Sequence, residues 1–152
     1  MINKPAIDIE RDNLLTDFGK EVLRDRYMLP TEKSPQEAFA RAAAAFADSD
    51  AHAKRLYDYS SKLWFMFATP ILSNGGTDRG LPISCFLNYV PDSREGLSEH
   101  YAENIWLSSS GGGIGGYWGD IRSQDQSTSK GNKTTGVIPF MHVVDSQMVA
   151  FN

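Results

Sequence analysis

The chain has 152 residues, 41% of them hydrophobic and 22% charged, a composition typical of one ordinary globular domain. Its formal net charge of −4 argues against nucleic acid or a membrane surface as the main partner. No apolar run reaches the roughly 18 residues of a membrane span, and no secretory signal is recognisable. A single cysteine cannot form an internal disulfide, so we expect a cytoplasmic protein.

Residues up to about 67 are predicted to form helices, and we assign 1–69 to a helical N-terminal domain. One helix has a clear start, since Ser34 is a good N-cap, Pro35 suits the first turn and Glu37 completes a capping box. Asp50 is expected to cap the next helix. The predicted core face of the helix after Ser34 comprises Ala38, Phe39, Ala42, Ala43 and Phe46.

The pattern changes after Pro70, and we assign 70–152 to an α/β region. Its expected elements are a strand covered on both faces from Ile83 to Val90, a helix from Ser93 to Leu107, a strand around Gly115 to Ile121, a mobile polar loop from Arg122 to Thr135, and a helix from Val137 to Phe151. The expected apolar side of the first of these helices contains Leu97, Tyr101, Ile105 and Trp106. Two strands do not make a stable parallel sheet, so we expect another chain to complete its edges.

Two segments rich in small and hydroxyl residues suggest a site that binds a polar ligand through main-chain groups. The first, residues 68–87, runs into the predicted strand and contains Cys85. The second is the glycine-rich run at 108–116. A lone cysteine is most often a small buried hydrophobic residue, and a glycine run is often only a turn, so neither segment alone specifies a function.

The two segments belong to an ordered set of motifs that indicates a family. The set consists of Ala68-Thr69-Pro70, Gly80-Leu81-Pro82-Ile83-Ser84-Cys85-Phe86-Leu87, Gly111-Gly112-Gly113-Ile114-Gly115, Ile121-Arg122-Ser123 and Gly136-Val137-Ile138-Pro139-Phe140. In order and spacing it resembles the large, catalytic (alpha) subunit of class I ribonucleotide reductase. The resemblance implies a mixed α+β and α/β chain: a helical N-terminal domain without a nucleotide-sensing cone, then the first strands of a ten-stranded α/β barrel completed by another chain.

The resemblance also implies roles for particular residues. Cys85 matches a redox-active cysteine that supplies reducing equivalents and is oxidised to a disulfide in each turnover. Thr69 and Ser84 match positions that hold the substrate phosphates, a role that hydroxyl groups suit. Gly112 and Gly113 match a turn beside the substrate, where a side chain would block its approach.

An allosteric site is implied as well. Asp92 and Ser93 match effector-binding positions, and Arg122 matches a basic residue that contacts the effector phosphates. The segment 123–135 then corresponds to the first specificity loop. Taken from the residues alone, Asp92 could simply cap the following helix. No metal or cofactor is expected on this chain, and its histidines share no metal-ligand spacing.

By the same resemblance, the chain is the N-terminal fragment of a split subunit. The expected partners are the C-terminal fragment of the large subunit, a small subunit that generates a radical at a dimetal centre, and a second copy of the assembled large subunit. Nucleoside diphosphates would be the substrates of this oxidoreductase of deoxyribonucleotide biosynthesis, with dNTP or ATP as effectors and thioredoxin or glutaredoxin as reductant. Nucleic acid and membranes are not expected as partners.

Two alternatives remain open at this point. One is a fragment of a class II reductase, which has the same barrel but draws its radical from cobalamin. The other is a non-catalytic remnant that binds nucleotide or the remaining subunit and turns nothing over. In the family, a further cysteine, absent from this chain, carries the radical during catalysis. A neighbouring reading frame that contains this cysteine would favour a catalytic role.

Overall fold

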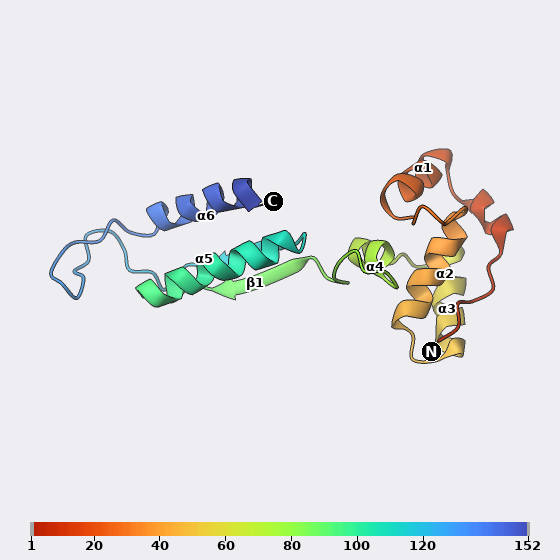
Figure 1. Cartoon of the computed structure of the whole chain (residues 1–152), viewed down its shortest axis with the longest axis horizontal. Coiled ribbons are helices and arrows are strands. Elements are labelled where there is room, and N and C mark those ends of the chain that lie inside the picture. The colour runs from red at the N-terminus through yellow and green to blue at the C-terminus, as the bar shows by residue number, and fades with distance from the viewer. Residues whose placement is uncertain (1, 152) are drawn as a thin grey trace. The chain divides into compact units, whose positions relative to one another are not determined.

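The computed structural model describes residues 2–151. The chain divides into two compact units, of which the first ends at Ile83 and the second begins at Ser84. This division lies later than the boundary after residue 69 that the sequence suggested. Helix α4 (Thr69–Asn74) packs against α2 (Pro35–Phe46), so the segment that follows Thr69 folds with the helical unit (Figure 1).

In the first unit, η1 (Ile9–Leu14), α1 (Asp17–Arg26) and α3 (Asp50–Ser61) surround α2. The buried residues of α2 include Ala38, Phe39, Ala42 and Ala43, as predicted. Phe46 was predicted with them but is 47% exposed, because it is the last residue of the helix. Small alanine side chains let the neighbouring helices approach closely, and α2 is therefore the centre of this unit.

The start of α2 uses both predicted capping residues, but in a different pattern. The Ser34 hydroxyl accepts a hydrogen bond from the Gln36 amide at 3.1 Å. The Glu37 carboxylate accepts from the amide of Lys33, not from that of Ser34. The reciprocal bonds of a capping box are thus each shifted by one residue, and the exposed amides at this helix end are still satisfied.

The prediction that Asp50 caps α3 is wrong. Ser49 is the N-cap, and its hydroxyl accepts from the His52 amide at 3.2 Å. The Asp50 carboxylate instead accepts two hydrogen bonds from Asn3, at 2.9 and 2.8 Å, which tie the N-terminal segment to the helix. Those bonds also lower the pKa of Asp50, because they stabilise its charged form.

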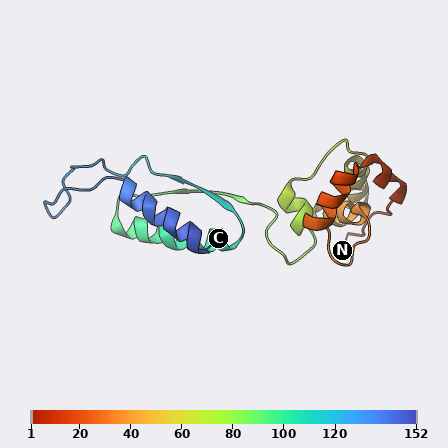
Figure 2. The same cartoon turned by 90° about the horizontal axis from the view of Figure 1, so that it is seen from above.

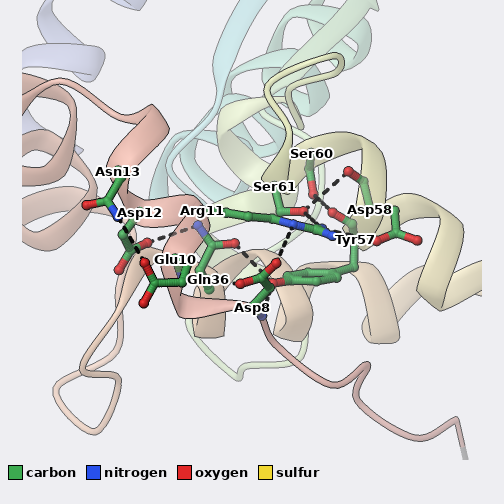
Figure 3. A network of polar contacts seen from close by, with 10 residues as sticks. All are labelled: Asp8, Glu10, Arg11, Asp12, Asn13, Gln36, Tyr57, Asp58, Ser60 and Ser61. Atoms are coloured by element: carbon green, nitrogen blue, oxygen red, sulfur yellow. Dashed lines mark hydrogen bonds and ion pairs between the residues drawn. The ribbon is translucent and has the colours of Figure 1, made fainter.

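A network of polar contacts joins η1 to α2 and α3 (Figure 3). Arg11 donates to Asp58 at 3.0 Å. The Gln36 amide donates to Asp12 at 2.9 Å and accepts from the Tyr57 hydroxyl at 3.1 Å. Gln36 is fully buried, so this pairing removes the cost of a buried amide and fixes η1 on the helices.

The second unit contains β1 (Cys85–Tyr89), α5 (Arg94–Ser109), β2 (Gly113–Tyr117) and α6 (Ile138–Phe151), with α6 lying along α5 (Figure 2). The strands are parallel neighbours, and Cys85 pairs with Gly113. The first strand is shorter than predicted. The second begins earlier than predicted, because the glycine run itself pairs with β1. No helix within residues 2–151 is long and apolar enough to cross a bilayer.

Helix α5 buries a polar stripe, contrary to the apolar side predicted from its sequence. The buried residues recur every four positions and are Gly96, His100, Asn104 and Ser108. Trp106, predicted on the buried side, is 76% exposed. The polar stripe is buried because it has a partner on the sheet: Asn88 Nδ2 of β1 donates to the side-chain oxygen Oδ1 of Asn104 at 2.8 Å.

The segment after β2 is more ordered than the expected mobile loop. The backbone amide of Asp125 donates to the Thr134 carbonyl at 3.0 Å, and the Thr134 amide donates to the Gln126 carbonyl at 3.0 Å. Ser127 and Lys133 form an antiparallel bridge. Residues 125–134 therefore form a small hairpin with regular backbone hydrogen bonds. The polar composition of this segment did not predict these bonds.

Candidate functional site

The two-stranded sheet has one covered face and one open face. Along β1, Phe86 and Asn88 are half-buried, and Asn88 bonds to α5. Cys85, Leu87 and Tyr89 alternate with them and are exposed, Leu87 to 89%. Because successive side chains of a strand point to opposite faces, the Cys85 thiol lies on the open face. The prediction of a strand covered on both faces does not hold within residues 2–151, since no element there packs on the open face.

Four of the five predicted substrate-binding residues lie together at the start of the two strands. The Gly113 amide donates to the Ser84 carbonyl at 2.7 Å, and Cys85 lies directly opposite Gly113. A Cβ on Gly113 would meet only the Ser84 carbonyl oxygen, at 3.8 Å. The space beside the thiol is therefore open, and it is bordered by backbone rather than by side chains.

Gly112 is required for a different reason. A Cβ at this position would overlap the ring of Phe86, which lies on the covered face. A substitution would displace either the ring or the turn that leads into β2. Gly112 therefore sets the path of the chain to Gly113.

The fifth predicted substrate residue, Thr69, belongs to the first unit. It is the first residue of α4, and its hydroxyl oxygen lies 3.2 Å from that of Tyr27. The Thr69 side chain is exposed, so its hydroxyl is accessible to a ligand.

The three predicted effector-binding residues meet near the other end of the strands. Arg122 Nε lies 2.6 Å from Asp92 Oδ2, although the two residues are 30 positions apart. Ser93, and not Asp92, caps α5, because its hydroxyl accepts from the Gly96 amide at 2.9 Å. The Asp92 carboxylate is therefore paired with a guanidinium instead of a helix end.

A cavity of about 470 Å³ adjoins this ion pair. Its polar lining residues are Asp92, Ser93, Arg94, Glu95, Arg122, Thr128, Ser129, Lys130, Asn132 and Thr134. The hairpin supplies the last five of these, and no sequence motif marked them individually. The sequence feature that could have indicated these hairpin residues is a lysine among hydroxyl and amide side chains, a combination that suits a phosphorylated ligand.

A polar chain lies beneath the covered face of the sheet. Glu103 accepts from the Asn88 amide nitrogen at 3.1 Å, and this fixes the orientation of that amide. Asn104 then accepts from Asn88, so its own nitrogen faces His100 Nε2 at 2.9 Å. His100 Nε2 must accept this bond, which requires a neutral ring. Burial lowers the pKa of His100, while the charge of Glu103 acts in the opposite direction.

This polar chain also borders a second cavity, of about 290 Å³, between α5, β2 and α6. No motif in the sequence singled out His100, although the recurrence of small and polar residues every four positions marked the stripe. Within residues 2–151, no group of three His, Cys, Asp or Glu side chains is arranged to hold a metal ion.

Both units match models of one family. Residues 13–80 match the ribonucleotide reductase all-alpha domain, and residues 83–152 match the ribonucleotide reductase barrel domain. The chain belongs to the ribonucleotide reductase large-subunit family. The family indicated by the sequence motifs is thereby confirmed, as is the order of a helical domain followed by the start of a barrel.

Relatives within the family agree along nearly the whole chain. The large subunit of ribonucleoside-diphosphate reductase from Invertebrate iridescent virus 3 is 44% identical over 147 residues, which are 96% of this chain and 22% of the relative. The one from Invertebrate iridescent virus 6 is 41% identical over 145 residues, 95% of this chain and 14% of the relative. The alpha subunit from Helicobacter pylori (strain ATCC 700392 / 26695) is 31% identical and covers 93% of this chain and 19% of the relative.

A solved structure supports the fold. The Actinobacillus ureae class Id ribonucleotide reductase alpha subunit matches with a TM-score of 0.77 and 28% identity, over 97% of this chain and 28% of that subunit. The chain spans 14–22% of the length of the three relatives above. Most of each relative therefore lies outside the matched region.

Proposed function

We propose that this chain is the N-terminal part of the large subunit of a class I ribonucleoside-diphosphate reductase, which replaces the ribose 2′-hydroxyl by hydrogen. The observation that carries the proposal is the open face at the start of the strands, where an exposed thiol stands beside the bare backbone of Gly113. A ribose ring must approach the thiol closely for this reaction, and this surface allows it. The names of the relatives support a diphosphate substrate.

In this reaction Cys85 is one of two reducing thiols. The substrate loses its 2′-hydroxyl as water and gains a hydrogen at that carbon. The two electrons come from Cys85 and a second cysteine in the remaining part of the subunit, which form a disulfide. Of the two thiol hydrogens, one ends in the new C–H bond and the other in the water that leaves. Thioredoxin or glutaredoxin then reduces this disulfide. The radical that starts the reaction is supplied from the dimetal centre of a small subunit.

The substrate site combines the residues described above. The hydroxyl groups of Thr69 and Ser84 donate hydrogen bonds to the phosphates, and Gly113 leaves room for the nucleoside. Gly112 sets the path of the turn that leads to Gly113. We propose that the barrel region starts near residue 83 and not at residue 70, because α4 packs with the helical unit. The rest of a ten-stranded barrel would come from the remaining part of the subunit, packing on the open face and free edges of the sheet.

The cavity at Asp92 is proposed to bind the nucleotide effector, a dNTP or ATP. Arg122 contacts the phosphates, while Asp92 and Ser93 offer acceptors to the sugar hydroxyl. Of the residues proposed to bind substrate, Ser84 and Cys85 lie at one end of β1, whereas Asp92 and Ser93 follow its other end. The two ligands would therefore be separated by roughly the 17 Å length of a five-residue strand. A second copy of the assembled subunit is the expected neighbour at the effector site.

The test replaces Cys85 with serine in the reductase assembled from this chain, the remaining part of the large subunit and the small subunit. We expect multiple turnover with a dithiol reductant to stop, while the substrate affinity stays within about twofold, since serine preserves size and polarity. In the wild-type enzyme, peptide mapping after one turnover without reductant should find Cys85 in a disulfide with a cysteine of the remaining part of the large subunit.

Other results would favour the alternatives. Normal turnover by Cys85→Ser, with no linked peptide, would remove the redox role. Turnover that needs adenosylcobalamin instead of the small subunit would indicate a class II enzyme. Nucleotide binding with no turnover under any of these conditions would indicate a non-catalytic role.

A further inference from the structure

The Thr69 hydroxyl is held by a residue that no motif of the family resemblance includes. Tyr27, the C-cap of α1, places its hydroxyl 3.2 Å from Thr69 Oγ1, across 42 residues of sequence. We propose that Tyr27 is a positioning residue that orients the Thr69 hydroxyl toward the substrate phosphate. This rests on the proposed function, in which Thr69 binds that phosphate.

Proton counting gives the hydrogen bond a direction. A phosphate oxygen accepts hydrogen bonds, so the single Thr69 proton must point to the substrate. The bond between the two hydroxyls must then be donated by Tyr27 and accepted by Thr69. A hydroxyl that accepts one bond becomes a better donor in the next. Tyr27 therefore both selects the rotamer of the Thr69 proton and strengthens its bond to the phosphate.

A buried arginine fixes both sides of this contact. Arg41, which is only 2% exposed, donates to the Tyr27 carbonyl at 3.1 Å. Its other terminal nitrogen donates to the carbonyls of Leu72 at 3.1 Å and Gly75 at 2.6 Å, in the last turn and at the C-cap of the helix that Thr69 begins. Glu32 holds the guanidinium at 2.7 Å. One rigid planar group thus sets the backbone of Tyr27 relative to that of α4.

The Tyr27 ring has a structural role that is separate from its hydroxyl. The ring is partly buried and packs against the hydrophobic core of the first unit. Tyr27→Phe keeps this packing and removes only the hydrogen bond, so it isolates the proposed role. Tyr59→Phe is the matched control, because Tyr59 is 48% exposed and its hydroxyl makes no hydrogen bond within residues 2–151.

The experiment is a double-mutant cycle in the assembled reductase, with a nucleoside diphosphate as the varied substrate. We expect Tyr27→Phe to raise KM about 3–10-fold, the equivalent of one hydrogen bond, and to leave kcat within about twofold. Thr69→Ala should raise KM at least as much, and adding Tyr27→Phe to it should cause no further rise. Thr69→Ser, which keeps the hydroxyl, should restore a KM close to that of the wild type. Binding of the nucleoside without phosphates should be the same in all variants.

The outcomes separate this inference from the function on which it rests. If Thr69→Ala raises KM but Tyr27→Phe behaves like Tyr59→Phe, or if the two effects simply add, the positioning role is overturned and the phosphate contact stands. If Thr69→Ala itself leaves KM unchanged, the phosphate contact fails and the positioning role fails with it.

Discussion

The two units of the chain bury different kinds of side chain. The hydrophobic cluster of buried residues lies within the first unit, from Leu23 to Leu72. In the second unit the buried apolar residues are Val90 and Ile121, and the buried face of α5 is lined with glycine, histidine, asparagine and serine. The first unit is therefore specified by packing of apolar side chains, and the second by hydrogen bonds between a helix and a sheet.

Both units leave large apolar side chains exposed, and in the first unit Phe18 is 75% and Trp64 72% exposed. The second unit leaves Leu87 on β1 89% exposed and Val149 on α6 82% exposed. Apolar side chains in such positions mark surfaces that contact other protein. Of the two, the second unit is the one on which the reductase is proposed to place its substrate and the rest of its barrel, while the first unit supplies a rigid support for Thr69.

The largest expected effect is on the first unit alone. Arg41→Ala removes the buried partner of Glu32, which is itself only 7% exposed, and frees the carbonyls at the end of α4. Leaving a buried charge unpaired costs about 3–5 kcal/mol. Hydrogen exchange followed by mass spectrometry should show faster exchange throughout α2 and α4 and little change in the second unit. Arg55→Ala, at an exposed position on α3, is the control. Equal acceleration in both units would contradict their independence.

The next effect concerns the proposed effector cavity. Arg122→Ala removes a phosphate contact and leaves Asp92 without its ion-pair partner, facing the bound anion. We expect effector affinity to fall about 10–100-fold, because a charge-assisted hydrogen bond contributes about 1.5–3 kcal/mol. Substrate affinity should change less than about threefold. Lys133→Ala, on the same hairpin but outside the cavity lining, is the control. Equal losses for effector and substrate in equilibrium binding would refute the assignment.

Two neighbouring glycines test the two faces of the sheet against each other. A Cβ on Gly116 would lie 2.9 Å from the Trp118 ring nitrogen and 3.2 Å from His100 on the covered face. A Cβ on Gly115 would meet only the end of the Leu87 side chain, at 3.1 Å, on the open face. Gly116→Ala should therefore destabilise the second unit by about 1–3 kcal/mol, and Gly115→Ala by much less. Urea unfolding of both variants measures the difference, and equal losses would mean that the two faces are packed alike.

The sequence predicted the longer helices well because their signals are local, but it did not predict the short helix α4. Caps such as Ser34 and the alanine-rich face of α2 depend on residues a few positions apart. It placed the start of β2 at Gly115 instead of Gly113, since glycine has low strand propensity and the strand exists only through pairing with β1. The polar stripe of α5 was missed because its partner, Asn88, lies on another element.

The candidate site shows the same limit. Cys85 and the glycine run were recognised as features by composition, but their roles came from the family resemblance. Residue chemistry alone could not place Arg122 beside Asp92, because the contact depends on where the chain turns after each strand. Tyr27 was missed altogether, since the contact that distinguishes it from a core tyrosine joins α1 to α4.

The smallest expected effect is a pH dependence confined to the second unit. His100 is buried and must be neutral to accept the bond from Asn104, and its pKa is lowered by burial. As the pH falls below about 6.5, the unfolded histidine binds a proton that the folded one does not, so stability decreases with acidification. The loss cannot exceed about 1.4 kcal/mol per pH unit for one proton.

His100→Gln removes this proton and should flatten the dependence of stability on pH, whereas His142→Gln, at an exposed position on α6, should leave it unchanged. Urea unfolding between pH 7.5 and 5.5 would measure this on a Trp64→Phe background, where tryptophan fluorescence arises only from the second unit. If both histidine variants keep the slope of the parent, other groups cause it and the polar chain does not hold His100 neutral.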